Sequence, residues 1–208
     1  MTLQENIPAP RPRLTVGILT LNEEKRIASC IQSAKFADQI LVIDSGSKDK
    51  TRDIAAALGA EVFEYADWQG FAVQRNRVLQ HAKGDYIFFL DADEEMPPAM
   101  QAEIEAVLAS DKDEIWEVQW NQVAFGRPLT LMKSTGGIPR MFKTKSIREF
   151  SGVVHEHAEM DGPQRAVKRF RSRLLHYSRE SIYGSLNKLA QYVQLGAAKR
   201  ARAGKTGG

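Results

Sequence analysis

The sequence lacks the features that mark secreted and membrane-spanning proteins. It has one cysteine in 208 residues, Cys30, which cannot form an intrachain disulfide. It has no run of eighteen or more apolar residues, and residues 1–12 are polar and proline-rich, without the apolar core of a signal peptide. These absences exclude a scaffold stabilised by internal disulfides. They predict a cytoplasmic protein with neither a signal peptide nor a membrane span.

Acidic side chains are scarce in the last third of the chain, although the net charge is only +3. Residues 1–139 carry 14 basic and 21 acidic side chains, and residues 140–208 carry 15 basic and 5 acidic ones. The two parts therefore have net charges of −7 and +10. The basic part predicts a polyanionic partner, such as anionic lipid or nucleic acid, or else a solvated face without a partner.

Short apolar runs alternate with helical patterns in the first half of the chain. The runs that predict strands are residues 14–19, 39–43, 61–65 and 85–90. The first helical pattern opens at Asn22 and places Ile27, Cys30 and Ile31 on one face. The further predicted helices are residues 51–58, 72–82 and 99–108. This alternation predicts an α/β fold with a mainly parallel central sheet and helices on both faces.

The pattern changes after the fourth helix. Residues 115–125 and 137–160 read as a meander or loops, and residues 183–199 predict a last helix. We therefore divide the chain into four parts within one domain. They are a flexible leader, a first half, a smaller second half, and a C-terminal helix with a basic tail, at residues 1–12, 13–110, 111–180 and 181–208.

Polar clusters follow three of the predicted strands. They begin at Thr20, Asp44 and Asp91, and the carboxyl ends of parallel strands form the ligand-binding edge of such a sheet. Asp44 either contacts a ligand or simply forms a turn with Gly46. Asp91 and Asp93 would point to one side of an extended backbone, where they suit Mg²⁺ or Mn²⁺ bound together with phosphate groups.

The motifs together resemble those of family 2 glycosyltransferases, which have the Rossmann-like GT-A fold. The motifs are Leu19-Thr-Leu-Asn-Glu23, Val42-Ile-Asp-Ser-Gly-Ser47, Gln74-Arg-Asn76, Gly84-Asp-Tyr86 and Leu90-Asp-Ala-Asp-Glu94. Three shorter motifs are similar to the lipopolysaccharide-core β-1,4-glucosyltransferase branch. They are Pro139-Arg-Met-Phe-Lys143, Val154-His-Glu156 and His176-Tyr-Ser178.

The resemblance implies a role for each matching residue. Those implied to bind the nucleotide-sugar are Thr20, Asn22, Glu23, Asp44, Ser45, Gly46, Arg75, Asp91 and Ala92. Asp93 of the DxD motif would hold the metal, and Ser45 replaces a second aspartate that many members have. Residues 13–110 would then form the nucleotide-sugar-binding half and residues 111–180 the acceptor-binding half.

The resemblance also implies an inverting reaction, which needs a general base on the acceptor side of the sugar. We expect Glu156 to be this base, with a surface glutamate as the alternative. His155 and His157 would share one face of a regular strand and Glu156 the other. If the segment is a loop, His155 could join Asp93 at the metal. We expect the three tryptophans in the core, with Trp68, near Gly70, the best candidate for ligand contact.

The expected donor is UDP-glucose, and the expected acceptor is a lipopolysaccharide-core or other cell-surface glycan or glycolipid. The basic third of the chain would hold the enzyme peripherally at the anionic inner face of the cytoplasmic membrane, without a nucleic-acid partner. Arg169, Arg171 and Arg173 would present three cations on one face of an extended strand. Two alternatives stay open: a nucleotide-sugar-forming nucleotidyltransferase, and a non-enzymatic domain that binds nucleic acid or membrane.

Overall fold

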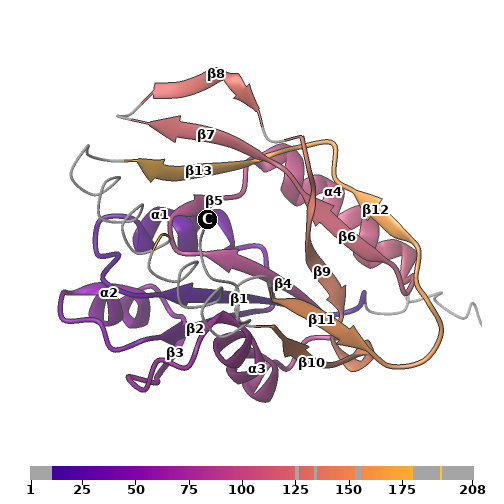
Figure 1. The fold of residues 1–208 in the computed structure, drawn as a ribbon, viewed down its shortest axis with the longest axis horizontal. Helices are drawn as coiled ribbons and strands as arrows, with labels where there is room; N and C mark the ends of the chain where they lie inside the picture. The colour runs from indigo at the N-terminus through magenta and orange to yellow at the C-terminus, as the bar shows by residue number, and fades with distance from the viewer. Residues whose placement is uncertain (1–10, 125–126, 134, 153–155, 180–192, 194–208) are drawn as a thin grey trace, which may run out of the picture.

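A computed structural model describes residues 11–124, 127–133, 135–152, 156–179 and 193. A seven-stranded sheet in the order β12-β6-β9-β4-β1-β2-β3 runs through it (Figure 1). In the part of this sheet that the first half of the chain forms, neighbouring strands are parallel to each other. They are β1 (Leu14–Thr20), β2 (Gln39–Asp44), β3 (Glu61–Glu64) and β4 (Tyr86–Asp91). The predicted parallel core of the sheet is confirmed: each short apolar run is a strand, and β1, β2 and β4 are buried along almost their whole length, whereas β3 at the edge is only partly buried.

Helices cover both faces of this sheet, as predicted. They are α1 (Ile27–Ser33), α2 (Thr51–Ala57), α3 (Phe71–His81) and α4 (Pro98–Ser110). Successive side chains of β1 point to opposite faces of the sheet, where they contribute to two separate hydrophobic cores. Val16 and Ile18 face one core, to which α1, α2 and α4 contribute, whereas Leu19 belongs to the core on the α3 side. Among the described residues, no helix has the length and apolarity needed to cross a bilayer.

Glycine at position 17 allows α3 to pack closely against β1. A Cβ atom at Gly17 would overlap Cγ1 of Val78, which is fully buried on α3. Any larger side chain would therefore push this helix away from the sheet. The close packing matters for the site because α3 carries Gln74 and Arg75.

The second half of the chain is more regular than the predicted meander or loops. Three of its strands extend the central sheet: β6 (Ile115–Val118), β9 (Ile138–Lys143) and β12 (Val167–Arg169). β9 is antiparallel to both β4 and β6. The remaining helix and strands are β5 (Glu94–Glu95), β7 (Trp120–Ala124), β8 (Arg127–Lys133), η1 (Thr144–Ser146), β10 (Ile147–Ser151), β11 (His157–Met160) and β13 (Leu174–Arg179).

A four-stranded sheet in the order β5-β13-β7-β8 lies beside the carboxyl end of β4. β13 and β7 lie above β4 in Figure 1, with β5 between them and β4. β5 follows β4 after a turn and pairs with β13, so that His176 lies opposite Glu94. The second sheet therefore approaches the edge where the acidic motif lies. The predicted last helix, at residues 183–199, lies almost wholly outside the described residues.

Two local predictions are wrong. The first helix begins at Ile27, not at Asn22, because Asn22 adopts a left-handed conformation with φ of 55°. The loop before this helix also forms hydrogen bonds to the loop after β2. The three-cation face is absent because β12 ends at Arg169, and residues 171–172 form a bend.

A third local prediction is wrong in part. Trp116 and Trp120 are partly buried against the core, as expected, whereas Trp68 is 50% exposed. The expected ligand contact of Trp68 stays a prediction.

Candidate active site

The sheet brings the three predicted polar clusters together at one edge. Thr20 lies opposite Asp44 on β2, and Leu19 lies opposite Asp91 on β4. Since parallel strands end in step here, the loops after β1, β2 and β4 share the ligand-binding edge of the sheet. The sequence-predicted nucleotide-binding residues on these strand ends are therefore neighbours in space.

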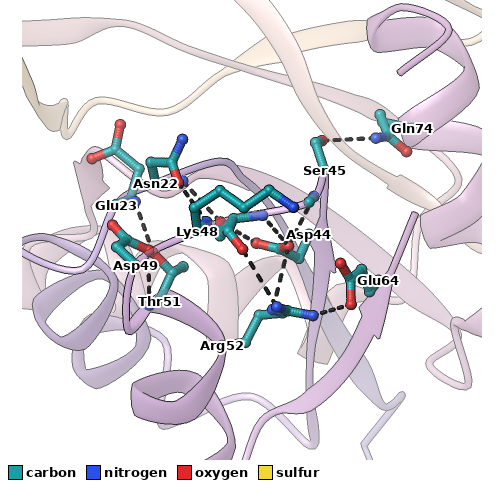
Figure 2. A network of polar contacts seen from close by, with 12 residues as sticks. Asn22, Glu23, Asp44, Ser45, Lys48, Asp49, Thr51, Arg52, Glu64 and Gln74 are labelled. Carbon is teal, nitrogen blue, oxygen red and sulfur yellow. Dashed lines mark hydrogen bonds and ion pairs between the residues drawn. The ribbon is translucent and has the colours of Figure 1, made fainter. Parts of the chain in front are cut away.

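The loops after β1 and β2 are joined by reciprocal hydrogen bonds (Figure 2). The Asn22 amide oxygen accepts from the backbone N–H of Lys48 at 2.8 Å, and the Asn22 N–H donates to the Ser47 hydroxyl at 2.8 Å. The backbone N–H of Glu23 donates to the Thr51 hydroxyl at 2.8 Å. These bonds satisfy backbone groups of both loops, so the loop conformation is fixed before any ligand binds.

The carboxylate of Asp44 forms hydrogen bonds within the turn that follows β2. Its side chain is fully buried, and its carboxylate accepts from the backbone N–H of Gly46 at 2.9 Å, from the N–H of Ser47 at 2.8 Å and from the Ser47 hydroxyl. Gly46 has a φ of +93°, which favours glycine. The geometry therefore supports the turn-forming interpretation of Asp44 more than direct contact with a ligand.

Two hydroxyl side chains remain at this edge. The Ser45 hydroxyl accepts a hydrogen bond of 2.7 Å from Gln74, which in turn accepts one of 3.0 Å from Arg77. The Thr20 hydroxyl is buried and has no hydrogen-bond partner within the described part of the chain. An unsatisfied buried hydroxyl is costly, so Thr20 is a candidate for a direct hydrogen bond to a ligand; the buried Nε of Arg140 also lacks a partner among the described residues.

A buried cluster of charges lies at the end of β4. Arg140 Nη2 on β9 is 2.7 Å from Asp91 Oδ2 and 3.2 Å from Glu94 Oε1. The Trp120 indole N–H donates to the same Glu94 oxygen at 2.6 Å, and the backbone N–H of Asp91 donates to the other at 3.0 Å. Arg140 therefore binds two carboxylates of the Asp91-Ala-Asp-Glu94 motif.

The charges of this cluster shift the pKa values of its acids in opposite directions. Burial raises the pKa of Glu94 to about 7. Burial would also raise the pKa of Asp91, but the positive charges of Arg140 and Arg75 outweigh it and lower that pKa well below its ordinary value. Asp91 is therefore ionised at neutral pH, whereas Glu94 is only partly so.

Arg75 connects this cluster to the predicted base. Its Nε donates to Glu156 Oε1 at 3.2 Å, and its Nη2 is 3.9 Å from Asp91 Oδ1. The guanidinium also lies over the rings of Phe89 and Phe150, 5.1 and 5.9 Å from their centroids. The side chain of Glu156 is 20% exposed, so it can still meet a ligand. Glu156 precedes β11 in a non-strand conformation, as the loop alternative required.

Asp93 has a histidine neighbour that the sequence reading did not single out. Residues 92–93 form a turn, so the expected extended backbone with Asp91 and Asp93 on one side is wrong. His176 Nε2 on β13 is 3.4 Å from Asp93 Oδ2, while Gln122 contacts Nδ1 at 3.1 Å. The hydrogen bond and charge of Asp93 outweigh burial and raise the pKa of His176. The only signal for this pair in the sequence was the His176-Tyr-Ser178 motif.

The side chains at this edge fit a divalent cation only in part. Within the described ranges, no group of three or more histidine, cysteine or acidic side chains could hold a metal ion. Asp91 is occupied by Arg140, whereas Asp93 and His176 together offer one oxygen and one nitrogen ligand. Mg²⁺ and Mn²⁺ are often bound by one or two protein groups and the phosphates of a ligand, and this set fits that arrangement. His155 lies outside the described residues.

Comparison with known proteins agrees with this arrangement. Residues 15–147 match the family model described as Glycosyl transferase family 2. An uncharacterized glycosyltransferase of Rickettsia bellii is 36% identical over 131 residues, which are 62% of this chain and 42% of that protein. The chain thus spans less than half the length of this relative. The Staphylococcus aureus TarS 1–349 structure, in complex with UDP-GlcNAc, has a TM-score of 0.61 at 16% identity. The match covers 83% of this chain and 60% of TarS 1–349, and it shows a common fold.

A longer match extends into the second half of the chain. The lipopolysaccharide core biosynthesis glycosyltransferase LpsC of Rhizobium meliloti is 26% identical over 204 residues. The match covers 94% of this chain and 74% of that protein.

Proposed function

Since the chain belongs to glycosyl transferase family 2, whose model matches most of its sheet, we propose that it transfers a sugar from a nucleotide-sugar to a glycan acceptor with inversion. The observation that carries this proposal is the arrangement around Arg75. This side chain contacts Glu156 and lies beside Asp91, while Asp93 follows in the adjoining turn. A proton acceptor and the predicted diphosphate site thus lie next to each other.

In the proposed reaction, the acceptor hydroxyl attacks the anomeric carbon and the bond to the diphosphate breaks. Glu156 takes the hydroxyl proton, and its hydrogen bond from Arg75 orients the carboxylate. A divalent cation held by Asp93 and His176 would supply positive charge to the departing diphosphate. Arg75 would offer a second positive charge near the same oxygen atoms, because it is buried between the two acids.

The loops after β1 and β2 would bind the nucleoside. We assign the direct contact to Thr20, whose buried hydroxyl has no partner among the described residues. Asn22, Asp44 and Gly46 would act by shaping the loops, because their polar groups are used within them. The contacts expected of Glu23, Ser45 and Ala92 stay predictions, as do the boundaries of the two halves.

The acceptor and the membrane contact are finer parts of the proposal. The match to LpsC supports a lipopolysaccharide-core acceptor, and the resemblance supports UDP-glucose as the donor. Peripheral attachment at the inner face of the cytoplasmic membrane would depend on the basic last third of the chain, residues 140–208. Its exposed Lys168 and Arg171 could contact anionic lipid, whereas Arg165 and Arg169 already pair with Asp113 and Glu117.

A donor screen tests the proposal. The protein would be incubated with UDP-, GDP- and dTDP-sugars and Mn²⁺, and release of the nucleoside diphosphate would be measured with and without glycan acceptors. We expect one donor class to be consumed, with activity lost in excess EDTA and in Asp93→Ala, because both remove the cation that stabilises the leaving group. Wild-type turnover in Asp93→Ala or in EDTA would contradict the metal assignment. No turnover with any donor would contradict the proposed function.

A further inference from the structure

The predicted base belongs to a small unit of the fold, the antiparallel pair of strands β10 and β11. In this strand pair, Ser151 lies opposite His157 and Phe150 lies opposite Ala158. Glu156 comes directly before His157, so the position of its carboxylate depends on where the strand pair lies. The strand pair forms a sheet of its own, separate from the central sheet. The contacts that attach it to the rest of the molecule therefore decide where Glu156 lies.

Asn76 on α3 attaches the strand pair through its side-chain amide. Its Oδ1 accepts from the backbone N–H of Phe150 at 2.6 Å, and its Nδ2 donates to the carbonyl oxygen of Phe150 at 3.0 Å. A side-chain amide has the same donor and acceptor as a peptide group, so Asn76 takes the place of a neighbouring strand on the edge of β10 away from β11. α3 lies next to β10 in Figure 1, and both bonds are partly buried.

The ring of the same phenylalanine attaches the strand pair to the core. Phe150 is 6% exposed, and its ring meets the rings of Phe89 and Phe142 edge to face, with centroids 4.9 and 6.1 Å apart. Burial of apolar surface has no preferred direction, whereas a hydrogen bond allows only a narrow range of distances and angles. The two bonds from Asn76 therefore fix the position of β10 along α3 more narrowly than the ring can.

The residue before Asn76 on the helix contacts the predicted base itself. Arg75 Nε donates to Glu156 Oε1 at 3.2 Å, and the guanidinium lies 5.9 Å from the centroid of the Phe150 ring. Two adjacent side chains of α3 thus bind the strand pair, one through the backbone of β10 and one through Glu156. The bond from Arg75 is already at the long end of the usual range, so a small displacement of the strand pair would break it.

We propose that Asn76 is a positioning residue that holds Glu156 in place for proton transfer, an inference that rests on the proposed function. A general base must lie within hydrogen-bond distance of the acceptor hydroxyl, and a displacement of about 1 Å can lower the rate about hundredfold. In this role, Asn76 acts on the reaction through the backbone of β10 and β11. Its loss should therefore lower kcat and leave the donor KM nearly unchanged.

The kinetic test is a double-mutant cycle of Asn76→Ala and Glu156→Gln, with UDP-glucose as the donor and a methyl heptoside as the acceptor probe. We expect Asn76→Ala to lower kcat about tenfold and to change the donor KM less than threefold. In the Glu156→Gln background, the same substitution should lower kcat less than twofold, because a residue that acts through Glu156 has nothing left to position. Equal losses of kcat in both backgrounds would overturn the proposal. Wild-type turnover in Glu156→Gln would refute the base assignment, and this inference with it.

Gln101→Ala is the matched control for lost stability. The Nε2 of Gln101 on α4 donates to the carbonyl oxygen of Ser33 at 3.0 Å, so the control also removes a bond between a helix side chain and a backbone carbonyl. α4 packs on the face of the central sheet away from α3. This variant should keep the wild-type kcat. A loss of kcat as large as that of Asn76→Ala would assign the effect to general destabilisation and would overturn the proposal.

Hydrogen exchange tests the attachment of the strand pair without turnover. The backbone N–H of Phe150 should exchange at least about tenfold faster in Asn76→Ala than in the wild type, whereas that of Ile18 in β1 should not change. Unchanged exchange at Phe150, or equally faster exchange at Ile18, would overturn a local role of Asn76. Faster exchange at Phe150 alone, in a protein that turns over no donor, would support the attachment and refute the proposed function.

Discussion

Replacing Arg140 by methionine should destabilise the fold strongly, although no ligand is involved. Arg140 is 4% exposed and is the cation that Asp91 and Glu94 share. Methionine fills much of the same space but leaves Glu94 without its cation and leaves Asp91 with only the more distant Arg75, at 3.9 Å. Removing one partner of a buried ion pair costs about 3–5 kcal/mol in free energy of unfolding. We expect the lower end, about 3 kcal/mol, because the Asp91 side chain is 34% exposed and water offsets part of its charge.

The assay is urea unfolding followed by circular dichroism, with the slope m unchanged if the variant is still folded. A loss of about 3 kcal/mol would lower the Tm by roughly 6–12 °C for a chain of this size. The matched control is Arg148→Met, since Arg148 is 56% exposed and its ion pairs with Glu159 and Asp161 are on the surface. This control should unfold like the wild type.

A compensating variant tests the electrostatic cause. Adding Asp91→Asn and Glu94→Gln to Arg140→Met removes the uncompensated charges and should recover part of the lost stability. If Arg140→Met costs less than about 1 kcal/mol, or no more than the Arg148 control, the reasoning about the buried cluster is refuted. A triple variant that is no more stable than Arg140→Met would show that lost packing, rather than charge, causes the effect.

Three further predictions concern single residues. Glu156→Gln should lower turnover by about 10² while the donor KM stays near that of the wild type, because only the proton acceptor is lost; steady-state kinetics would contradict this if donor affinity fell and turnover held. Burial raises the pKa of Glu94 from its ordinary value of 4.5 to about 7. Between these pH values the folded protein holds a proton on Glu94 that the unfolded chain has lost, so the free energy of unfolding should fall as the pH rises from 4.5 to about 7. Thermal unfolding across this range should show the fall in the wild type, and an equal fall in Glu94→Gln would refute the assignment. Gly17→Ala should cost about 1–3 kcal/mol in urea unfolding, because its Cβ overlaps Val78, and Val78→Ala in the same chain should reverse part of this loss.

Local patterns in the sequence predicted the first half of the fold well. The runs that became β1, β2 and β4 are mostly apolar without a polar–apolar alternation, which is typical of strands buried on both faces. The loop after β1 was missed because its conformation depends on bonds to residues of the next βα loop, such as Asn22 to Lys48. Hydrophobic periodicity contains no information about such contacts.

The sequence predicted individual residues of the site but not the contacts between them. Asp91 and Asp93 were identified, whereas Arg140 and His176, which contact them, come from β9 and β13. Both residues stood in the motifs that carry the resemblance, yet nothing in their spacing indicated a partner. Strands β6 and β9 were missed as parts of the main sheet because short antiparallel strands depend on distant partners more than on their own composition.

The ion pair between Arg140 and Asp91 also affects the order in which the chain can mature during synthesis. Arg140 follows Asp91 by 49 residues, so the ribosome completes β1 to β4 and α4 well before it adds the cation that neutralises their acidic edge. Until then, only Arg75 can pair with Asp91, and Glu94 must stay hydrated or protonated because its cation is missing. The N-terminal half can therefore reach its final packing only after β9 has docked against β4. A premature stop between the two strands would leave a βα fragment with an open, acidic sheet edge, the kind of surface that chaperones and proteases act on.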